Sequence, residues 1–234
     1  MPSSLSAEEL GIILLSLRVA LVSVACSLPV AVAIAYALAR FRFPGKTLLD
    51  AAVHLPLVLP PVVVGFALLI LLGKRGPIGS WLNDWFGVVF AFRWTGAALA
   101  SAIMGFPLMV RAIRLSIEAI DRRLETAAST LGASPLRVFT SITLPLAAPG
   151  ILTGALLSFA RGLGEFGATI TFVSNIPGET ETLPLAIYTF TQMPGGDAAA
   201  LRLSLIAVLL SVVALIASQW LATRIDHRAS GDRR

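Results

Sequence analysis

The sequence predicts an all-α integral membrane protein with about five transmembrane helices, for three reasons. Hydrophobic residues make up 56% of the 234 positions and charged residues only 13%. Soluble domains are about a quarter charged, so this chain has too few charged residues to cover a water-soluble surface. The mean hydropathy is +0.86, and five segments are apolar over the roughly 20 residues that a helix needs to cross a bilayer.

The five predicted spans begin close to the N-terminus and occupy most of the chain. Ser6 and Glu9 have the spacing of a capping box, which predicts that the first helix starts outside the membrane. This first span is not expected to be a signal peptide, because acidic residues precede it and its apolar run is too long. The predicted spans are Leu10–Ala39, Leu48–Leu72, Trp94–Ile117, Leu146–Phe172 and Leu201–Ala222.

Prolines interrupt the second and third spans. Pro56, Pro60 and Pro61 predict a kink in the second helix and Pro107 predicts one in the third, because proline removes a backbone donor and crowds the preceding turn. Broken helices persist in membranes where neighbouring helices or a water-filled cavity satisfy the freed backbone groups. The pattern therefore favours a protein that lines a pathway over a simple anchor.

Lys and Arg residues gather on one side of the predicted bundle. Basic loops mark the cytoplasmic side of membrane proteins, so we expect the N-terminus outside and the tail, residues 223–234, in the cytoplasm. The same rule accounts for the net charge of +5 without a nucleic-acid partner. Twelve of the 18 basic residues fall on this side: Arg40, Arg42, Lys46, Arg111, Arg114, Arg122, Arg123, Arg137, Arg224, Arg228, Arg233 and Arg234.

The sequence offers no residues for catalysis or metal binding. Cys26 is the single cysteine, and His54 and His227 have no second ligand at useful spacing. The stretch 45–47, Gly-Lys-Thr, ends like a phosphate-binding loop, but Arg40 stands where the leading glycine is needed. We therefore expect this chain to bind neither a metal nor a cofactor, and to have no ATPase site.

A polar segment, residues 121–145, lies between the third and fourth spans and predicts a hairpin of two short helices in the cytoplasm. Asp121 can cap a first helix, and Gly132 can end it in a left-handed conformation. Ser134 and Pro135 are a typical N-cap and first-turn pair for a second helix. The first helix either packs on its own bundle or offers one face to another protein, with these residues at helical spacing: Leu124, Ala127 or Ala128, and Leu131.

This hairpin resembles the cytoplasmic coupling motif of ABC importer permeases. That motif is an acidic-Ala-Ala triplet, three residues, Gly, nine residues and Ile-x-Leu-Pro. In this chain Thr126 stands where the acid usually does, and Glu125 precedes it. The resemblance implies a coupling helix that inserts into a cleft of a separate ATPase subunit, which would bind ATP and Mg. The matching residues are Thr126, Ala127, Ala128, Gly132, Ile142, Leu144 and Pro145.

Two opposite charges, Arg161 and Glu165, lie four residues apart inside the predicted fourth span. If that helix starts near Leu146, Arg161 lies about 22 Å into a core of about 30 Å. A charge there costs about 2.5–3.5 kcal/mol on insertion scales and should face the bundle interior. The two residues either neutralise each other to fix helix packing or lend positive potential to an anion pathway. Nearby glycines predict close helix approach: Gly162, Gly164 and Gly167.

Residues 164–182 resemble the signature of molybdate permeases, and sulfate and tungstate permeases carry related forms of Leu-Gly-Glu-Phe-Gly-Ala. The resemblance also covers residues 59–65 and 194–196. It implies a type I ABC importer permease of the bacterial inner membrane, a homodimer that receives molybdate from a periplasmic binding protein. Tungstate or sulfate and thiosulfate are the alternative substrates. Passing contacts to the anion would come from Thr169, Thr171, Ser174 and Asn175.

Two other classes compete with this interpretation. An ATP-independent anion channel or secondary transporter would also need proline-broken spans and interior charges, but it would leave the hairpin without a function. A membrane scaffold or receptor would need neither the broken spans nor the interior charges.

Overall fold

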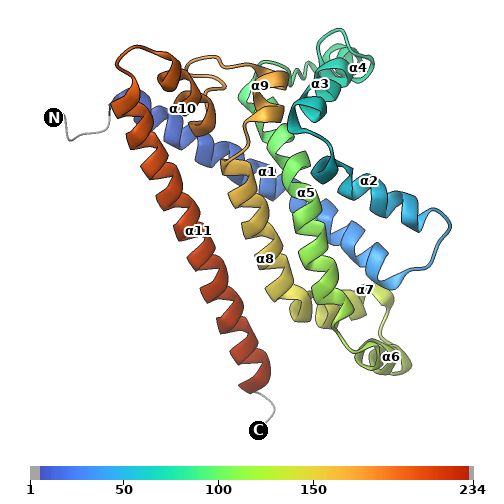
Figure 1. Cartoon of the computed structure of the whole chain (residues 1–234). Helices are drawn as coiled ribbons and strands as arrows, with labels where there is room; N and C mark the ends of the chain where they lie inside the picture. The colour runs from blue at the N-terminus through green and yellow to red at the C-terminus, as the bar shows by residue number, and fades with distance from the viewer. Residues whose placement is uncertain (1–5, 232–234) are drawn as a thin grey trace.

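The computed structural model describes the backbone of residues 6–231 and the side chains of residues 6–217. Within these residues all regular structure is helical, which confirms the predicted fold class. Figure 1 shows the long helices side by side, with α6 at one end of the bundle and α4, α9 and α10 at the other. We call these the hairpin end and the far end. The helices are α1 (Ala7–Arg40), α2 (Lys46–Val58), α3 (Pro61–Leu72), α4 (Pro77–Phe86), α5 (Trp94–Glu118), α6 (Arg122–Thr130), α7 (Pro135–Val138), the π-helix η1 (Phe139–Thr143), α8 (Leu144–Leu163), α9 (Gly167–Val173), α10 (Leu183–Gln192) and α11 (Asp197–Gly231).

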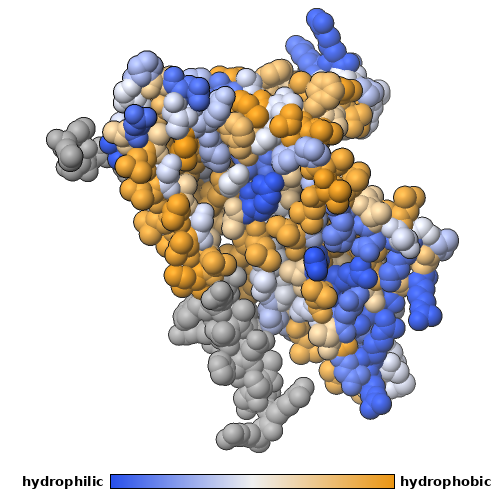
Figure 2. Space-filling view, in the orientation of Figure 1, coloured by the Kyte–Doolittle hydropathy of each residue, from blue (hydrophilic) through white to orange (hydrophobic). Residues whose placement is uncertain are grey.

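Helix α5 lies at the centre of the bundle and packs against α1 and α8. Small residues allow this close approach, because a Cβ on Gly105 would lie 2.3 Å from Ser158 Oγ and one on Gly154 would lie 2.9 Å from a backbone oxygen of Met109. Helix α5 continues through Pro107. Figure 2 shows hydrophobic residues over the first part of α11 and the middle of this face, as a lipid-facing surface requires.

The capping box at the start of α1 is confirmed. The Ser6 N–H donates to Glu9 Oε2 at 2.8 Å, and the Glu9 N–H donates to Ser6 Oγ at 3.1 Å. The Glu9 carboxylate, 3% exposed, also accepts a hydrogen bond from Arg202 Nε at 2.9 Å. This ion pair holds the first turn of α1 against α11.

The second predicted span is divided into two helices in the structure. Helices α2 and α3 meet at an angle of 114°, which is far more than a kink. The reason lies in the pair Pro60 and Pro61, neither of which can donate a backbone hydrogen bond, and in the extended conformation of Leu59 before them. Four described helices are long and apolar enough to cross a membrane, or five if this bent pair counts as one.

The fourth predicted span, Leu146–Phe172, is also wrong at both ends. A continuous 29-residue helical run, Pro135–Leu163, starts in the hairpin and passes through η1 into α8. Pro145 has no backbone N–H to donate, and the π-turn before it accommodates this residue within the helix. In this turn the Leu144 N–H donates to the Phe139 carbonyl, five residues back. The run ends before residues 164–166, so Arg161 occupies the last turn of α8 and does not lie in the middle of a longer span.

The C-terminal helix is longer than predicted. It begins at Asp197 and its backbone is helical to Gly231, so residues 223–231 of the expected tail continue α11. Residues 232–234 lie outside the described part of the chain. Two short helices at the far end, α4 and α10, fall in segments for which the sequence analysis predicted no helix.

Candidate functional site

The hairpin has the local geometry that its sequence predicts. The Asp121 side chain caps α6, and Gly132 follows the helix with φ +87°. The N–H groups of Gly132 and Ala133 donate to carbonyls one turn back, at 3.0 and 3.1 Å, which is the Schellman arrangement. Ser134 then caps α7 with Pro135 in its first turn. The two caps and the glycine turn set the angle between the helices.

Glu125 holds the hairpin to the bundle. Its Oε2 lies 3.0 Å from Arg40 Nε at the end of α1, and its Oε1 accepts a hydrogen bond from Thr143 Oγ1 at 2.7 Å. Arg40 also donates to the Ile120 carbonyl at 3.3 Å. The Arg40 and Glu125 side chains are only 7% and 16% exposed. Glu125 therefore joins α1, α6 and η1 and does not present its charge to a partner.

Sequence reasoning missed both partners of Glu125. Neither role that the sequence analysis gave Arg40 involved Glu125, and Thr143 occupies the variable position of Ile-x-Leu-Pro. They lie 85 and 18 residues from Glu125 in the chain. No local pattern links positions at those separations, so the pairing required the fold.

One face of the hairpin is apolar and uncovered, although most of its other exposed residues are polar. No residue of α6 is buried. Helix α6 is therefore held to the bundle through Glu125 and leaves its other face uncovered. Leu131 is 88% exposed, Leu136 is 72% exposed and Leu124 is 48% exposed. Ala127 is exposed beside them. We call this surface the docking face: Leu124, Ala127, Leu131 and Leu136.

The other motif residues lie around the docking face or behind it. Thr126 is exposed and its hydroxyl donates to the carbonyl one turn back, while Ala128 is half-buried. Ile142 and Leu144 are half-buried where η1 passes into α8, and Pro145 is exposed. These residues shape the base of the hairpin.

At the far end, Glu165 occupies the break between α8 and α9. Its Oε1 accepts a hydrogen bond from the Ala168 N–H at 2.8 Å and so satisfies one backbone donor in the first turn of α9. Its Oε2 lies 2.5 Å from Arg161 Nη1, although the angles are not those of a hydrogen bond. The Glu165 residue is 2% exposed. The predicted ion pair exists, but it bridges two helices and does not lie within one.

Helix α9 packs directly on α3. A Cβ on Gly65 would lie 2.5 Å from the Ala168 carbonyl oxygen, and one on Gly167 would lie 2.8 Å from Pro61 Cβ. Gly162 is buried on α8, and Gly164 is exposed in the break. The two half-helices that follow the breaks in the second and fourth predicted spans therefore touch each other.

The predicted polar contacts do not form an open site. Thr169 is buried, and Thr171 Oγ1 donates to the Gly167 carbonyl within α9. Ser174 ends α9 with φ +63°. Asn175 Nδ2 donates to Thr189 Oγ1 at 2.7 Å, and its Oδ1 is buried without a hydrogen-bond partner in the described chain.

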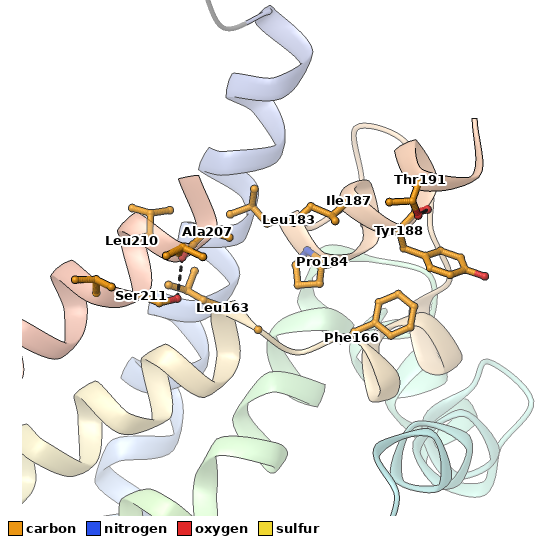
Figure 3. Close-up of a pocket in the computed structure, with 13 residues that line it drawn as sticks. Leu163, Phe166, Leu183, Pro184, Ile187, Tyr188, Thr191, Ala207, Leu210 and Ser211 are labelled. Carbon is orange, nitrogen blue, oxygen red and sulfur yellow. Dashed lines mark hydrogen bonds between the residues drawn. The ribbon is translucent and has the colours of Figure 1, made fainter. Parts of the chain in front are cut away.

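An apolar groove at the far end is a poor site for an anion. Figure 3 shows this groove of about 650 Å³ between α8, α10 and α11, with Phe166 and Tyr188 close together. Their ring centroids lie 5.3 Å apart. Its other labelled residues are mainly aliphatic, and no cation lines it. Charge complementarity with an oxyanion is therefore absent there.

The fold defines a multi-pass membrane protein whose hairpin presents an exposed apolar face. The family described as "Binding-protein-dependent transport system inner membrane component" matches residues 27–227. The chain is 58% identical over 227 residues to the molybdenum transport system permease protein ModB of Escherichia coli (strain K12), covering 97% of this chain and 99% of that protein. The ModB protein of Haemophilus influenzae is 56% identical over 220 residues, covering 94% and 96%.

A crystal structure of a bacterial ABC transporter involved in the import of the acidic polysaccharide alginate has the same fold. Its TM-score is 0.75 at 18% identity, covering 94% of this chain and 81% of that one. The chain therefore belongs to the family of inner membrane components of binding-protein-dependent transport systems, and it is a multi-pass protein of the inner membrane.

Proposed function

We propose that this chain is the permease subunit of an ATP-driven importer that moves molybdate across the bacterial inner membrane. The two relatives whose names give molybdenum transport support the substrate, since they match almost the whole chain. The importer acts as a homodimer and receives molybdate from a periplasmic binding protein. Tungstate and sulfate share the tetrahedral oxyanion chemistry and are the competing substrates.

The docking face is the observation that carries the coupling role. Several apolar side chains gathered on one exposed face mark an interaction site, and here Leu131 is 88% exposed, Leu136 72% and Leu124 48%. The partner is an ATPase subunit in the cytoplasm, which binds ATP and Mg, while this chain binds no cofactor. The hairpin end is accordingly the cytoplasmic end.

The mechanism is alternating access driven by that partner. The run Pro135–Leu163 is one helical body, so a displacement of the hairpin carries α8 with it up to Arg161. ATP binding favours one arrangement of the ATPase subunits. That arrangement binds one permease conformation more tightly than the other, and this difference in affinity drives the conformational change. Arg161 and Glu165, with Gly162, Gly164 and Gly167, form the moving part of the pathway at the far end.

The test replaces Leu131 with Gln, and the matched control is Leu131→Met, which keeps an apolar side chain. Burying a leucine contributes about 1.5–3 kcal/mol, so Leu131→Gln should weaken association with the ATPase subunit by roughly tenfold or more. ATP-driven uptake of molybdate into proteoliposomes should fall with it. Unchanged association together with unchanged uptake would remove the coupling role, and uptake without ATP would indicate a channel.

Two further experiments test the substrate and the pathway. Competition by excess tungstate or sulfate during molybdate uptake identifies the preferred anion, and stronger competition by sulfate would refute the molybdate assignment. Arg161→Leu should reduce uptake more than it reduces assembly of the complex. Equal loss of both would show that Arg161 serves helix packing.

A further inference from the structure

A second charged feature lies near the hairpin end, in a groove of about 350 Å³ between α2 and α5. Figure 2 shows hydrophilic residues gathered over α2 and the adjoining part of α5. Both helices lie in predicted membrane spans, where charged side chains are costly unless they face water, protein or a ligand. The groove is lined by Asp50, His54, Arg111, Arg114, Leu115 and Glu118.

Most of these charges neutralise one another. Arg114 Nη1 lies 3.0 Å from Asp50 Oδ1, and Arg114 Nε lies 2.8 Å from Glu118 Oε1. His54 Nδ1 lies 2.8 Å from the Asp50 carbonyl oxygen, which can only accept, so this nitrogen donates. The same nitrogen lies 3.3 Å from Asp50 Oδ1. Arg114 and His54 are therefore occupied by α2 and α5 themselves.

Arg111 differs from its neighbours. It is exposed on α5, one turn before Arg114, and forms no ion pair with any residue whose side chain the structure describes. It lies seven residues, about 10 Å, from the end of α5 at Glu118. A guanidinium presents paired N–H groups that match two oxygens of a tetrahedral oxyanion. Arg111 thus offers the groove an uncommitted anion-binding group.

We propose that this groove is a weak oxyanion site in the inner half of the transport pathway, with Arg111 as its binding group. This inference rests on the proposed function and adds a substrate contact to it. Asp50 and Glu118 balance the two arginines, so the lining has no large excess of positive charge. Weak binding suits an exit, because a permeating ion must leave as readily as it arrives.

The phosphate of an anionic lipid headgroup has the same tetrahedral oxygens, so the experiment must separate the two sources. The probe is a Leu115→Cys reporter in a Cys26→Ser background, because Leu115 lines the groove, is 58% exposed and takes no part in the ion pairs. The permease with its ATPase subunit is reconstituted in nanodiscs. The rate of modification by a membrane-impermeant thiol reagent is then measured with and without molybdate.

We expect molybdate at twice its dissociation constant to slow modification about threefold. Arg111→Gln should abolish this protection. The control Arg42→Gln, which removes the same charge from an exposed loop outside the groove, should retain it. The absence of protection, or equal protection in Arg111→Gln, would overturn the proposal. Slower modification in nanodiscs of phosphatidylglycerol than in nanodiscs of phosphatidylcholine, with no effect of molybdate, would also overturn the proposal. That result would identify a lipid site.

A transport measurement separates this inference from the proposed function. In proteoliposomes, Arg111→Gln should lower ATP-driven molybdate uptake several-fold while the ATPase rate stays unchanged. Normal uptake by both the wild type and Arg111→Gln would refute the site and leave the importer assignment intact. Absence of ATP-driven uptake in the wild type would refute the importer assignment itself.

Discussion

Replacing Glu125 with Ala should loosen the hairpin from the bundle. The substitution leaves the Arg40 guanidinium, 7% exposed, without its counter-charge at 3.0 Å, and Thr143 loses the acceptor at 2.7 Å. Breaking a fully buried pair costs about 3–5 kcal/mol, and a hydrogen bond to a charged group contributes about 1.5–3 kcal/mol. Because Glu125 retains 16% exposure, water partly replaces it. We therefore expect a loss of about 2–3 kcal/mol.

Hydrogen exchange of the α6 amides in nanodiscs measures this loss directly. A change of about 2–3 kcal/mol corresponds to roughly 30- to 150-fold faster exchange through local opening. The control is the double variant Glu125→Ala with Arg40→Met, which removes the unpaired charge. It should be less destabilised than the sum of the single variants, because the two residues act on one interaction. Unchanged exchange in Glu125→Ala, or strict additivity in the double variant, would refute the reasoning.

Two other predictions concern the far end. Gly65→Ala places a Cβ 2.5 Å from the Ala168 carbonyl oxygen and should cost about 1–3 kcal/mol of stability through overpacking of α3 on α9. The control Gly11→Ala, whose Cβ would meet nothing within 4 Å, should be neutral. Equal thermal stabilities of the two variants would contradict this prediction. Burial of the Glu181 carboxyl raises its pKa, and Glu8 nearby raises it further, which outweighs a hydrogen bond from Asn175. Since the folded-state pKa lies above the unfolded value, the stabilisation is complete below the unfolded pKa and is lost as pH rises through the folded pKa. Thermal unfolding between pH 4 and 8 should show this decline, Glu181→Gln should flatten it, and an unaltered slope in that variant would exclude Glu181 as its source.

The features that sequence reasoning predicted correctly depend on residues close together in the chain. Asp121, Gly132 and the pair Ser134 and Pro135 each act within one helical turn, so the caps and the turn of the hairpin could be derived from spacing alone. The capping box of Ser6 and Glu9 is another such case. In the same way, the number of apolar segments follows from composition, because a bilayer sets the length of a span.

The breaks in the second and fourth predicted spans depend also on residues that are far apart in the chain. Hydropathy counts apolar residues and does not sense the direction of the chain, so residues 164–166 were included in one long span. The turn is stabilised by contacts that arrive from elsewhere: α3 packs on α9 at Gly65, and Glu165 accepts a hydrogen bond from the first turn of α9 while it faces Arg161. These contacts form only when both half-helices are in place.

By itself, the sequence determined that the chain is a helical membrane protein, where most of its helices lie and how its hairpin begins and ends, since these depend on solvent transfer and on hydrogen bonds within a few residues. Only the tertiary structure decided what Glu125 binds and where the long spans break. It also decided that Arg111 has no counter-charge among the described side chains while Arg114 has two. Charges that lie 64 to 85 residues apart become neighbours only through packing, and the free energy of a charge depends on the neighbours that it finds.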